Sequence, residues 1–582
     1  MLHTKTNTSV LAARTQVLCN PLKLQKLSFL RITVLLLIAS ITCFGFTTTI
    51  TLDEINSNPP SREKNFLIWQ FLNQEINASQ ASEAFYQIDM VNERFLHDYA
   101  KKTDEADIVY TSQCLQKPSE ALMAIIPDDC LYLALSPSKA LALHPFERKH
   151  IASRLEGKFG DVSWLNTMNQ ENHFTLYSDI ASSLHLFTLT GSQYHQEHFN
   201  HTLDPETLMA LAGSKNFGAL AFLTITDPKM DKLQESLSLI NGGTFDGQTH
   251  FYLGINALKY KQPQSALFHF KEASAKVYKP IDKDKVTFWL YQTTGEQTYL
   301  DDLSNSLDLN MYALWGKEKS GVVPQNYFTT LPMTQSGGFA GDNPFEWNAL
   351  HKEIISSTKD NVVDLIERYS GENSLAVQAY IIERIYTPLI HNFTMPYDQY
   401  MTELSIDQKA MLYALMRQET RMIPGLISRS FALGSMQIMP FNVDTISKAH
   451  PLKITSYSDM FNPKFNIAYA ISHMKHIDNT LYNPVLKAYA YNGGLGLTKR
   501  HILNNGQFLA GNYEPFMSME LVGNHENREY GKIVLANYVI YKKILGEEVS
   551  ITSLFDSLTQ PALSDCFRAK ALMPLGVVSQ SE

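Results

Sequence analysis

The sequence predicts an all-α (mainly α) protein: an irregular superhelical arm of helical hairpins over residues 46–330, followed by a second α-helical domain over 401–550. Apolar residues recur at helical spacing through the arm, a pattern that indicates amphipathic helices. A helix-start signal at residue 405 then opens a strongly apolar helix. Turn-rich stretches at 331–344 and 389–404 separate the two parts.

The composition is that of a globular chain. Of the 582 residues, 44% are hydrophobic and 18% are charged, which excludes a disordered, collagen-like or disulfide-dense protein. The 49 basic and 58 acidic residues give a net charge of −9, so we expect no nucleic-acid partner. Residues 401–550 nevertheless carry 15 basic against 12 acidic residues, so the second domain is mildly cationic and the part before it acidic.

The N-terminus has the pattern of an export signal. Basic residues end at Arg31, and an apolar run of 15 residues follows, Ile32–Phe46, with a small-x-small sequence at Cys43–Gly45. The run is shorter than the ~20 residues that span a bilayer as a helix. Residues 1–45 are therefore predicted to be a signal peptide that directs the protein to the periplasm, with no stable transmembrane segment after cleavage. An uncleaved anchor is the alternative.

Two cysteines of the arm form a disulfide candidate. Cys114 and Cys130 lie on either side of a proline turn in a chain predicted to be exported, where disulfides persist. Two buried thiols are the alternative. Cys566 has no predicted partner, and without a C-x-x-C pair a cysteine zinc site is not indicated.

The clearest hairpin of the arm lies at 248–277. Two apolar-periodic runs are separated by Gln262–Gln264, with the small-then-aromatic spacing seen in tetratricopeptide hairpins. No strict 34-residue period is present, so a regular repeat array is not predicted. The arm is expected to be a scaffold or clamp, or a helical domain with no special role.

Residues 331–400 are predicted to contain a hinge and linking helices, with a helical pattern over 345–388. Residues 551–582 are predicted to be a C-terminal tail.

A candidate general acid lies at the end of the helix that begins after Ser405. Ser405 and Gln408 form a capping-box pattern, and the apolar run ends near Glu419 and Thr420. Burial and the negative end of the helix dipole both oppose ionisation there, so we expect a raised pKa for Glu419, as a general acid requires. Taken alone, a glutamate at a helix end is more often a solvated surface group.

Three further motifs accompany Glu419 in order. They are Gly434-Ser435-Met436-Gln437-Ile438-Met439-Pro440, Ala490-Tyr491-Asn492-Gly493-Gly494 and Glu526-Asn527-Arg528-Glu529-Tyr530. Together with Glu419-Thr420 they resemble the catalytic domain of the soluble lytic murein transglycosylases (SLT domain, glycoside hydrolase family 23), which looks like goose-type lysozyme. From Glu419 to Tyr530 the four motifs span about a fifth of the chain. The helical arm resembles the helical ring of the large members by architecture only.

The resemblance implies a lysozyme-like fold for 401–550 and cleavage of the β-1,4 bond between N-acetylmuramic acid and N-acetylglucosamine of peptidoglycan. A single glutamate, Glu419, would protonate the glycosidic oxygen. It would then act as base on the muramyl C6 hydroxyl, which closes a 1,6-anhydro ring. An internal nucleophile has an effective molarity on the order of 10⁵ M or more in favourable cases, so it competes with water.

Residue roles follow the family pattern at matching positions. Tyr491 would be catalytic with Glu419, hydrogen-bonding near the carboxyl or the charged transition state. The residues expected to contact substrate or orient the site are Ser428, Gln437, Met439, Asn492 and Glu526. Core packing is the alternative for Met439, and a structural ion pair is the preferred role for Arg528.

The sequence departs from the family pattern at several positions. Thr420 replaces Ser, Gly493 replaces Ala and Asn527 replaces Thr, all of them small changes. Ser435 places a hydroxyl where the family has a leucine, and Phe431 stands where glycine is usual. These changes affect the expected fine specificity and not the reaction class.

The resemblance implies no cofactor and no metal; His473 and His476 lie three apart on one expected helix, but no third ligand is indicated. Expected partners are peptidoglycan glycan strands, with other cell-wall enzymes or envelope complexes as further candidates. Two other functions remain open. A lysozyme-type hydrolase would need a second carboxylate, for which Asp444 and Glu526 are the nearby candidates. A non-catalytic envelope scaffold would only bind glycan.

Overall fold

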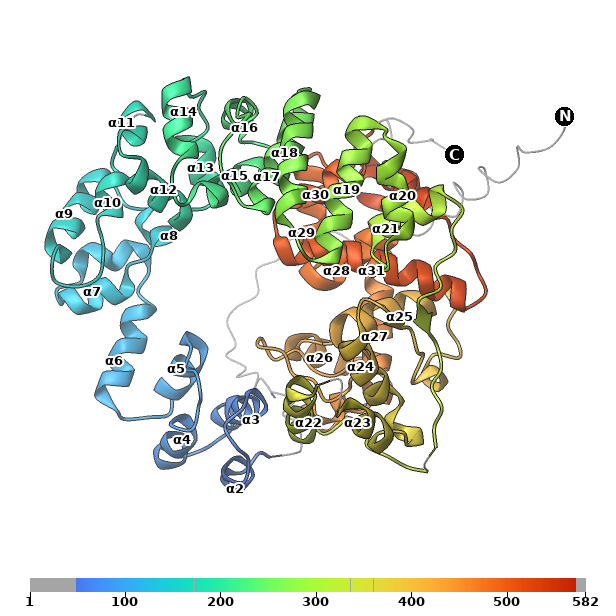
Figure 1. Ribbon diagram of the computed structural model, residues 1–582. Helices are drawn as coiled ribbons and strands as arrows, with labels where there is room; N and C mark the ends of the chain where they lie inside the picture. The colour runs from blue at the N-terminus through green and yellow to red at the C-terminus, as the bar shows by residue number, and fades with distance from the viewer. Residues whose placement is uncertain (1–48, 171–172, 335, 359–360, 572–582) are drawn as a thin grey trace, which may run out of the picture. The chain divides into compact units, whose positions relative to one another are not determined.

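The computed structural model describes residues 49–170, 173–334, 336–358 and 361–571 (Figure 1). It is built almost wholly of short helices, as the sequence predicted, and its one sheet among these residues has two strands. The predicted signal peptide, residues 1–45, lies outside the described residues. The chain divides into two compact units, each described separately here: an N-terminal unit (50–324 with 516–528) and a C-terminal unit (325–515 with 529–571).

The N-terminal unit is a succession of short helices, many of them packed against the next one along the chain (Figure 1). Its elements are α2 (Leu52–Asn56), α3 (Arg62–Leu72), α4 (Ala78–Phe85), α5 (Glu93–Ala100), α6 (Ala106–Leu115), η1 (Ser119–Ala124), α7 (Asp128–Ala134), α8 (Pro137–Ala140), α9 (Pro145–Leu155), α10 (Trp164–Thr167), α11 (His173–Ser178), α12 (Ile180–Leu189), α13 (Ser192–His198), α14 (Pro205–Ala212), α15 (Phe217–Ile225), α16 (Asp231–Leu237), α17 (Gly247–Lys259), α18 (Pro263–Lys276), α19 (Pro280–Thr294), α20 (Gln297–Asn305), α21 (Met311–Lys319) and α30 (Phe516–Glu520).

The predicted hairpin is present as α17 and α18, with the break at residues 260–262. The two helices pack closely because Gly254 has no side chain: a Cβ there would lie 2.6 Å from the ring of Phe270. A disulfide joins Cys114 at the end of α6 to Cys130 in α7, with the Cα atoms 5.1 Å apart. Closing a loop of 16 residues contributes about 3 kcal/mol in the chain-entropy account of disulfide stabilisation.

The late segment 516–528 belongs to the N-terminal unit, which the sequence did not indicate. The carboxylate of Glu520, fully buried in α30, accepts hydrogen bonds from the Tyr312 hydroxyl and from Nε1 of Trp289 at 3.4 Å. The buried guanidinium of Arg528 lies 5.0 Å above the ring of Phe222 and donates to the carbonyl of Val522 at 2.8 Å. These contacts give Arg528 a structural environment of aromatic and main-chain partners.

The C-terminal unit contains all the other elements. They are β1 (Tyr327–Phe328), α22 (Pro344–Ser356), α23 (Val362–Arg368), η2 (Glu372–Ser374), α24 (Leu375–Tyr386), β2 (His391–Asn392), η3 (Asp398–Tyr400), α25 (Ile406–Thr420), α26 (Pro440–Ser447), η4 (Tyr457–Phe461), α27 (Pro463–Asp478), α28 (Pro484–Gly493), α29 (Leu495–Lys499), η5 (Arg500–Asn504), α31 (His525–Ile544, grouped with this unit from Glu529 onward), α32 (Ile551–Leu558), α33 (Pro561–Ser564) and α34 (Cys566–Ala571).

The two strands of this unit are parallel, with Tyr327 paired to His391 and Phe328 to Asn392. The pairing places β1, just before the turn-rich stretch 331–344, beside β2, which follows the linking helix α24. Strands of two residues are too short to show the alternating pattern by which a sequence indicates a strand. From the sequence, Tyr327–Phe328 was expected to belong to the helical arm and His391–Asn392 to the second turn-rich stretch, with no strand at either position.

Residues 551–571, within the predicted C-terminal tail, form three short helices that are packed into the C-terminal unit. The buried Arg568 donates to Asp565 at 2.8 Å and to the carbonyl of Leu558 at 2.7 Å. Asn483, at the start of α28, donates to the carbonyl of Leu554 at 2.8 Å. This segment therefore supports α28, one of the helices that bear site residues.

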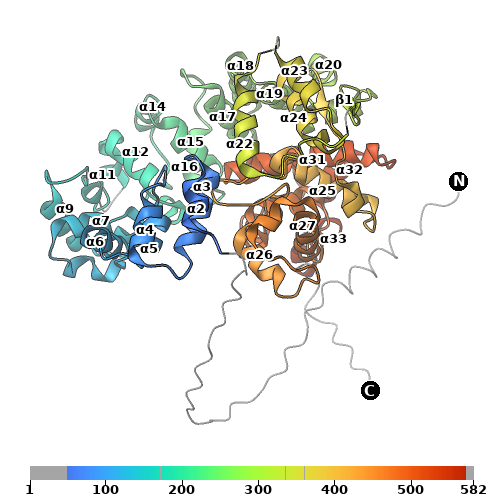
Figure 2. The same cartoon turned by 90° about the horizontal axis from the view of Figure 1, so that it is seen from below.

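Helices α26 and α27 pack against each other (Figure 2). Helix α28 packs against α27 in turn, and α28 and α31 approach each other at a glycine. A Cβ on Gly531 would lie 2.1 Å from the ring of Tyr489, a fully buried residue of α28. Any larger residue at 531 therefore forces the two helices apart. Among the described residues no single helix is long and apolar enough to cross a membrane; one bent pair, α14 and α15, reaches that length and composition jointly.

Gly531→Ala should destabilise the C-terminal unit by about 1–3 kcal/mol, the usual cost of overpacking a close contact. The measurement is the free energy of unfolding from urea denaturation followed by fluorescence. Gly496→Ala is the matched control, because a Cβ there meets only the Arg500 guanidinium, at 3.8 Å. Equal stability of the two variants would show that α28 and α31 do not need this close approach.

Candidate active site

The helix that carries Glu419 is α25, and its start confirms the capping-box prediction. The Ser405 hydroxyl accepts from the Gln408 amide N–H at 3.3 Å, while the Gln408 side chain accepts from the Ser405 N–H at 3.2 Å. At the other end the chain leaves the helix through two left-handed residues, Arg421 (φ 55°) and Met422 (φ 74°). Left-handed conformations of such residues are strained and concentrate at functional sites. Glu419 is the penultimate residue of α25, immediately before this turn.

The half-buried carboxylate of Glu419 accepts a hydrogen bond of 2.6 Å from the Tyr530 hydroxyl on α31. Tyr530 is 4% exposed, so its ring is fixed by packing and its hydroxyl is held on Oε1. A hydrogen bond to an ionised acceptor is about twice as strong as one between neutral groups. No role was expected for Tyr530 from the sequence, although it is the last residue of the fourth motif. Its place in that motif was the available signal.

Tyr491, near the end of α28, is also brought to this region. Its hydroxyl donates to the Met436 carbonyl at 2.6 Å. Burial and, after it, the charge of Glu419 raise the pKa of Tyr491 well above its ordinary value. Tyr491 is therefore a neutral hydrogen-bond donor at physiological pH, close enough to Glu419 to respond to its charge.

The loop between α25 and α26 is held by one buried side chain, Asn466 of α27. Its carbonyl oxygen accepts from the Met436 N–H at 2.7 Å and the Ser435 hydroxyl at 3.1 Å, and its amide donates to the Leu433 carbonyl at 2.9 Å. The loop can come this close because Gly434 (φ +76°) has no Cβ, which would lie 2.4 Å from the Asn466 amide nitrogen. Asn466 thus fixes the backbone from which Met436 presents its carbonyl to Tyr491.

Two residues that depart from the family pattern, Thr420 and Ser435, form hydrogen bonds with this loop and its support. The Thr420 hydroxyl donates to the Ser435 carbonyl at 2.9 Å, which ties the end of α25 to the loop. The Ser435 hydroxyl is fully buried and donates to Asn466, so the polar group that replaces leucine has a partner. Phe431, in the left-handed region at φ 68°, is 5% exposed.

The side chains of Gln437 and Ser428 form hydrogen bonds with the backbone of the same loop. The Gln437 amide donates to the carbonyls of Leu426 at 3.1 Å and Gly434 at 2.8 Å. The Ser428 hydroxyl oxygen accepts from the N–H of Ala432 at 2.9 Å. Both residues therefore shape the loop, whatever they contact beyond it.

The remaining predicted site residues are placed as follows. Met439 is half-buried at the start of α26, and Asn492 is half-buried directly after Tyr491. Glu526 is exposed in the first turn of α31 and belongs to the N-terminal unit. Asp444, a candidate second carboxylate, accepts hydrogen bonds from the Tyr457 hydroxyl at 2.9 and 3.1 Å, and burial raises its pKa.

The ring of His473 lies edge-on to that of Tyr491, with centroids 5.5 Å apart. Burial lowers the pKa of His473, so it is neutral at physiological pH. Within the described ranges no group of three or more His, Cys, Asp or Glu side chains could hold a metal ion. The arrangement around Glu419 consists of one carboxyl, two phenols and a braced loop. These groups can donate and accept hydrogen bonds, and the carboxyl can take up or release a proton.

A family match covers the part of the chain that contains Glu419 and Tyr491. Residues 398–513 match the family described as the transglycosylase SLT domain. No curated protein matches the chain. Among solved structures, the chain is similar to the lytic transglycosylase Slt of Pseudomonas aeruginosa, an inactive mutant, with 15% identity over 86% of this chain and 84% of that one and a TM-score of 0.42. It is also similar to the 70 kDa soluble lytic transglycosylase of Escherichia coli, with 15% identity over 87% and 90% and a TM-score of 0.43.

The matched range contains Glu419, the braced loop and Tyr491, while Tyr530 lies beyond its end. Residues 398–513 are therefore a transglycosylase SLT domain, and this part of the chain contains the candidate acid and the loop beside it.

Proposed function

We propose that this protein is a peptidoglycan lytic transglycosylase that acts in the periplasm on glycan strands. It cleaves the MurNAc-β-1,4-GlcNAc bond and leaves a 1,6-anhydro-MurNAc end. The observation that carries the proposal is the Glu419 carboxyl at the end of α25, held by the Tyr530 hydroxyl inside an SLT domain. The family relationship supports the reaction class, and the product and the single-carboxyl mechanism are our inference.

The proposed reaction needs one carboxyl in two roles. Protonated Glu419 gives its proton to the glycosidic oxygen as the bond from that oxygen to the muramyl C1 breaks. The resulting carboxylate then takes the proton of the C6 hydroxyl of the same sugar as O6 forms its bond to C1, which regenerates the protonated acid. A positioned internal hydroxyl has an effective molarity on the order of 10⁵ M or more, so no second carboxylate is required to activate water.

Tyr530 fits both states of this cycle. Its hydroxyl occupies Oε1 of Glu419, so the transferable proton is directed to the other carboxyl oxygen. When Glu419 is a carboxylate, the same bond stabilises its negative charge. Tyr530 therefore orients the acid in the first step and stabilises the base in the second.

Tyr491 contributes as a neutral donor. Its raised pKa excludes a phenolate base near neutral pH, and its bond to the Met436 carbonyl connects α28 to the loop. We propose that it steadies the charged transition state beside Glu419. Ser428, Gln437, Met439 and Asn492 are proposed to contact the sugars, with Glu526 as a further orienting group.

A lysozyme-type muramidase on the same domain is the alternative, and it would place Asp444 as the group that activates water. We favour the transglycosylase because Asp444 lies exposed beside Tyr457, and because an internal hydroxyl needs no second carboxylate to activate water. A scaffold that only binds glycan would have no use for the bond between Tyr530 and Glu419.

Glu419→Gln should lower turnover of purified sacculi by about 10²–10⁴-fold, the usual contribution of general acid–base catalysis, and leave the fold intact. Mass spectrometry of the released muropeptides is the measurement, and wild-type products should be one water lighter than reducing muropeptides. Glu403→Gln, at an exposed position before α25, is the matched control and should match wild type. Full activity of Glu419→Gln would remove Glu419 from the mechanism.

Tyr530→Phe should reduce kcat about 10–100-fold, since a hydrogen bond to a charged group is worth about 1.5–3 kcal/mol. KM should change little, because the phenol is bonded to Glu419. Steady-state kinetics on a soluble glycan oligomer, with circular dichroism as a folding check, separates the two constants. A rate equal to that of wild type would reduce Tyr530 to a packing residue.

Tyr491→Phe should lower kcat by about tenfold, the value of one lost hydrogen bond of roughly 1.4 kcal/mol, and affect glycan binding less. Binding to the Glu419→Gln background, measured by isothermal titration calorimetry, isolates affinity from turnover. If affinity falls as much as turnover does, Tyr491 binds substrate and has no part in the chemical step.

A further inference from the structure

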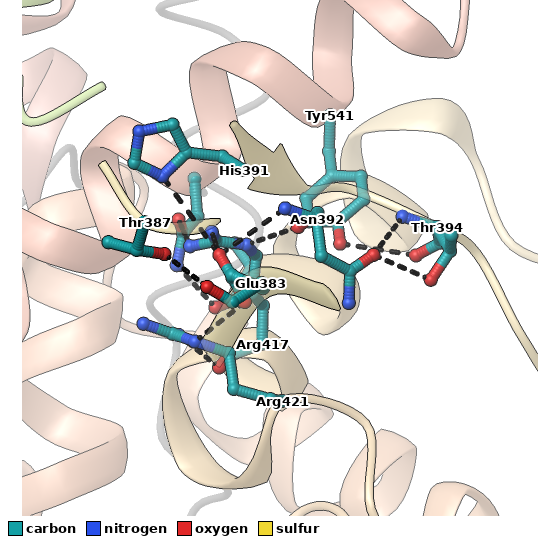
Figure 3. Close-up of polar contacts among 10 residues, drawn as sticks. Glu383, Thr387, His391, Asn392, Thr394, Arg417, Arg421 and Tyr541 are labelled. Atoms are coloured by element: carbon teal, nitrogen blue, oxygen red, sulfur yellow. Dashed lines mark hydrogen bonds and ion pairs between the residues drawn. The ribbon is translucent and has the colours of Figure 1, made fainter. Parts of the chain in front are cut away.

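A buried ionic cluster lies behind the end of α25, centred on Glu383 of α24 (Figure 3). The Glu383 side chain is 8% exposed. One carboxylate oxygen bonds to the Arg417 guanidinium and accepts from the Asn392 N–H at 3.3 Å; the other lies 3.3 Å from Nε of Arg421. Nδ1 of His391 is 4.0 Å from the same carboxylate.

The cluster is charged in the folded protein. Burial raises the pKa of Glu383, but the two arginines outweigh it and hold that pKa below its ordinary value. Burial lowers the pKa of Arg421 to about 10, which still leaves its guanidinium charged at neutral pH. The phenols of Tyr541 and Tyr380 lie close enough to Arg421 to oppose this lowering of its pKa. Glu383 is thus the anion that compensates two cations at the end of the helix bearing Glu419.

Arg417 is fixed on several sides by this arrangement. Its Nε donates to the Asn392 carbonyl at 2.6 Å, its Nη1 donates to the Asn537 side chain at 2.7 Å, and its guanidinium lies 4.2 Å above the ring of Phe393. Figure 3 shows Arg417 and Arg421 converging on Glu383, with Asn392 alongside. An arginine held in this way fixes the helix to which it belongs.

The cluster and the catalytic carboxyl lie on opposite faces of α25. Two residues along an α-helix correspond to a rotation of about 200°, so Arg417 points away from Glu419. Arg421 completes the turn: its Nη1 donates to the Arg417 carbonyl at 2.5 Å, and its backbone N–H donates to the same carbonyl at 3.2 Å. The last turn of α25 is therefore fixed by Glu383 on the face opposite Glu419, while Glu419 itself faces Tyr530.

The same contacts set the register of α25 against α31. Tyr530 and Asn537 are seven residues apart on α31 and so lie on one face, two turns from each other. Tyr530 donates to Glu419, and Asn537 accepts from Arg417 and donates to the Ala414 carbonyl at 3.3 Å. A shift of Arg417 would therefore move Glu419 relative to Tyr530.

We propose that Glu383 is a positioning residue for the catalytic carboxyl, acting through Arg417 and Arg421. Glu383 lies outside the matched range 398–513, so the linking helix α24 is a working part of the active site. The inference rests on the proposed function, since it takes Glu419 as the acid. A purely structural role would change only the amount of folded enzyme.

The test compares Glu383→Gln and Arg421→Asn with wild type in the full-length protein. Asparagine is chosen at 421 because it tolerates the left-handed conformation found there. The matched control is Glu353→Gln, which removes an exposed ion pair of 2.8 Å with Arg368 in the same unit. The measurements are thermal unfolding by circular dichroism, kcat and KM on a soluble glycan oligomer, and the dependence of kcat on pH. Rates are expressed per folded molecule.

We expect folded Glu383→Gln and Arg421→Asn to lose about tenfold or more in kcat with KM within about twofold, as for a misplaced catalytic group. In Glu383→Gln the two guanidiniums lose their counter-charge and favour the carboxylate form of Glu419. Activity needs the protonated form, so the basic limb of the kcat profile should move to lower pH. Glu353→Gln should match wild type in all three measurements.

Folded Glu383→Gln with an unmoved pH profile and wild-type kcat per folded molecule would overturn the inference. If Glu383→Gln does not fold, Arg421→Asn decides: its kcat must fall, and a wild-type rate overturns the inference. A double variant, Glu383→Gln with Glu419→Gln, should be no slower than Glu419→Gln alone, because the two act on one step. Activity retained by Glu419→Gln would refute the proposed function itself, whereas loss there with no effect at Glu383 refutes only the inference.

Discussion

The hydrogen bond between Tyr530 and Glu419 is the interaction on which the geometry of the candidate site depends. It joins the end of α25 to α31 at 2.6 Å and so sets the direction in which the carboxyl points. Glu383, through Arg417, holds α25 from the opposite face, and Gly531 allows α31 to approach the helix that carries Tyr491. A half-buried acid at a helix end is ordinary, but one held from two sides has a fixed direction, which the proposed acid–base role requires.

Local features of this site were predictable from the sequence. The capping box of Ser405 and Gln408 and the end of α25 near Glu419 depend on contacts within a few residues, and the structure confirms both. The hairpin of α17 and α18 was indicated by its periodicity in the same way. The resemblance to the family was also visible in the sequence, since its motifs are short and occur in the family's order.

The features that the sequence did not indicate come from distant pairs. Tyr530 lies 111 residues from Glu419, and Glu383 lies 34 residues from Arg417, with no periodic pattern to link either pair. The two-residue strands are below the length at which alternation is visible. Glu520 and its segment pack against the arm through buried polar contacts. Because glutamate is usually exposed, a single sequence gives no reason to expect Glu520 to be buried. A charged side chain is buried where the fold brings it a hydrogen-bonding or oppositely charged partner, and such partners are distant in the sequence.

The central claim is that the muramyl C6 hydroxyl, and not water, attacks the anomeric carbon. The most direct measurement is digestion of purified sacculi in H₂¹⁸O, with borohydride added at once to trap reducing ends, followed by mass spectrometry of the muropeptides. The account predicts products that lack one water and carry no ¹⁸O at the muramyl end. Reducing muramyl ends that each contain one ¹⁸O would contradict it, because water would then be the nucleophile.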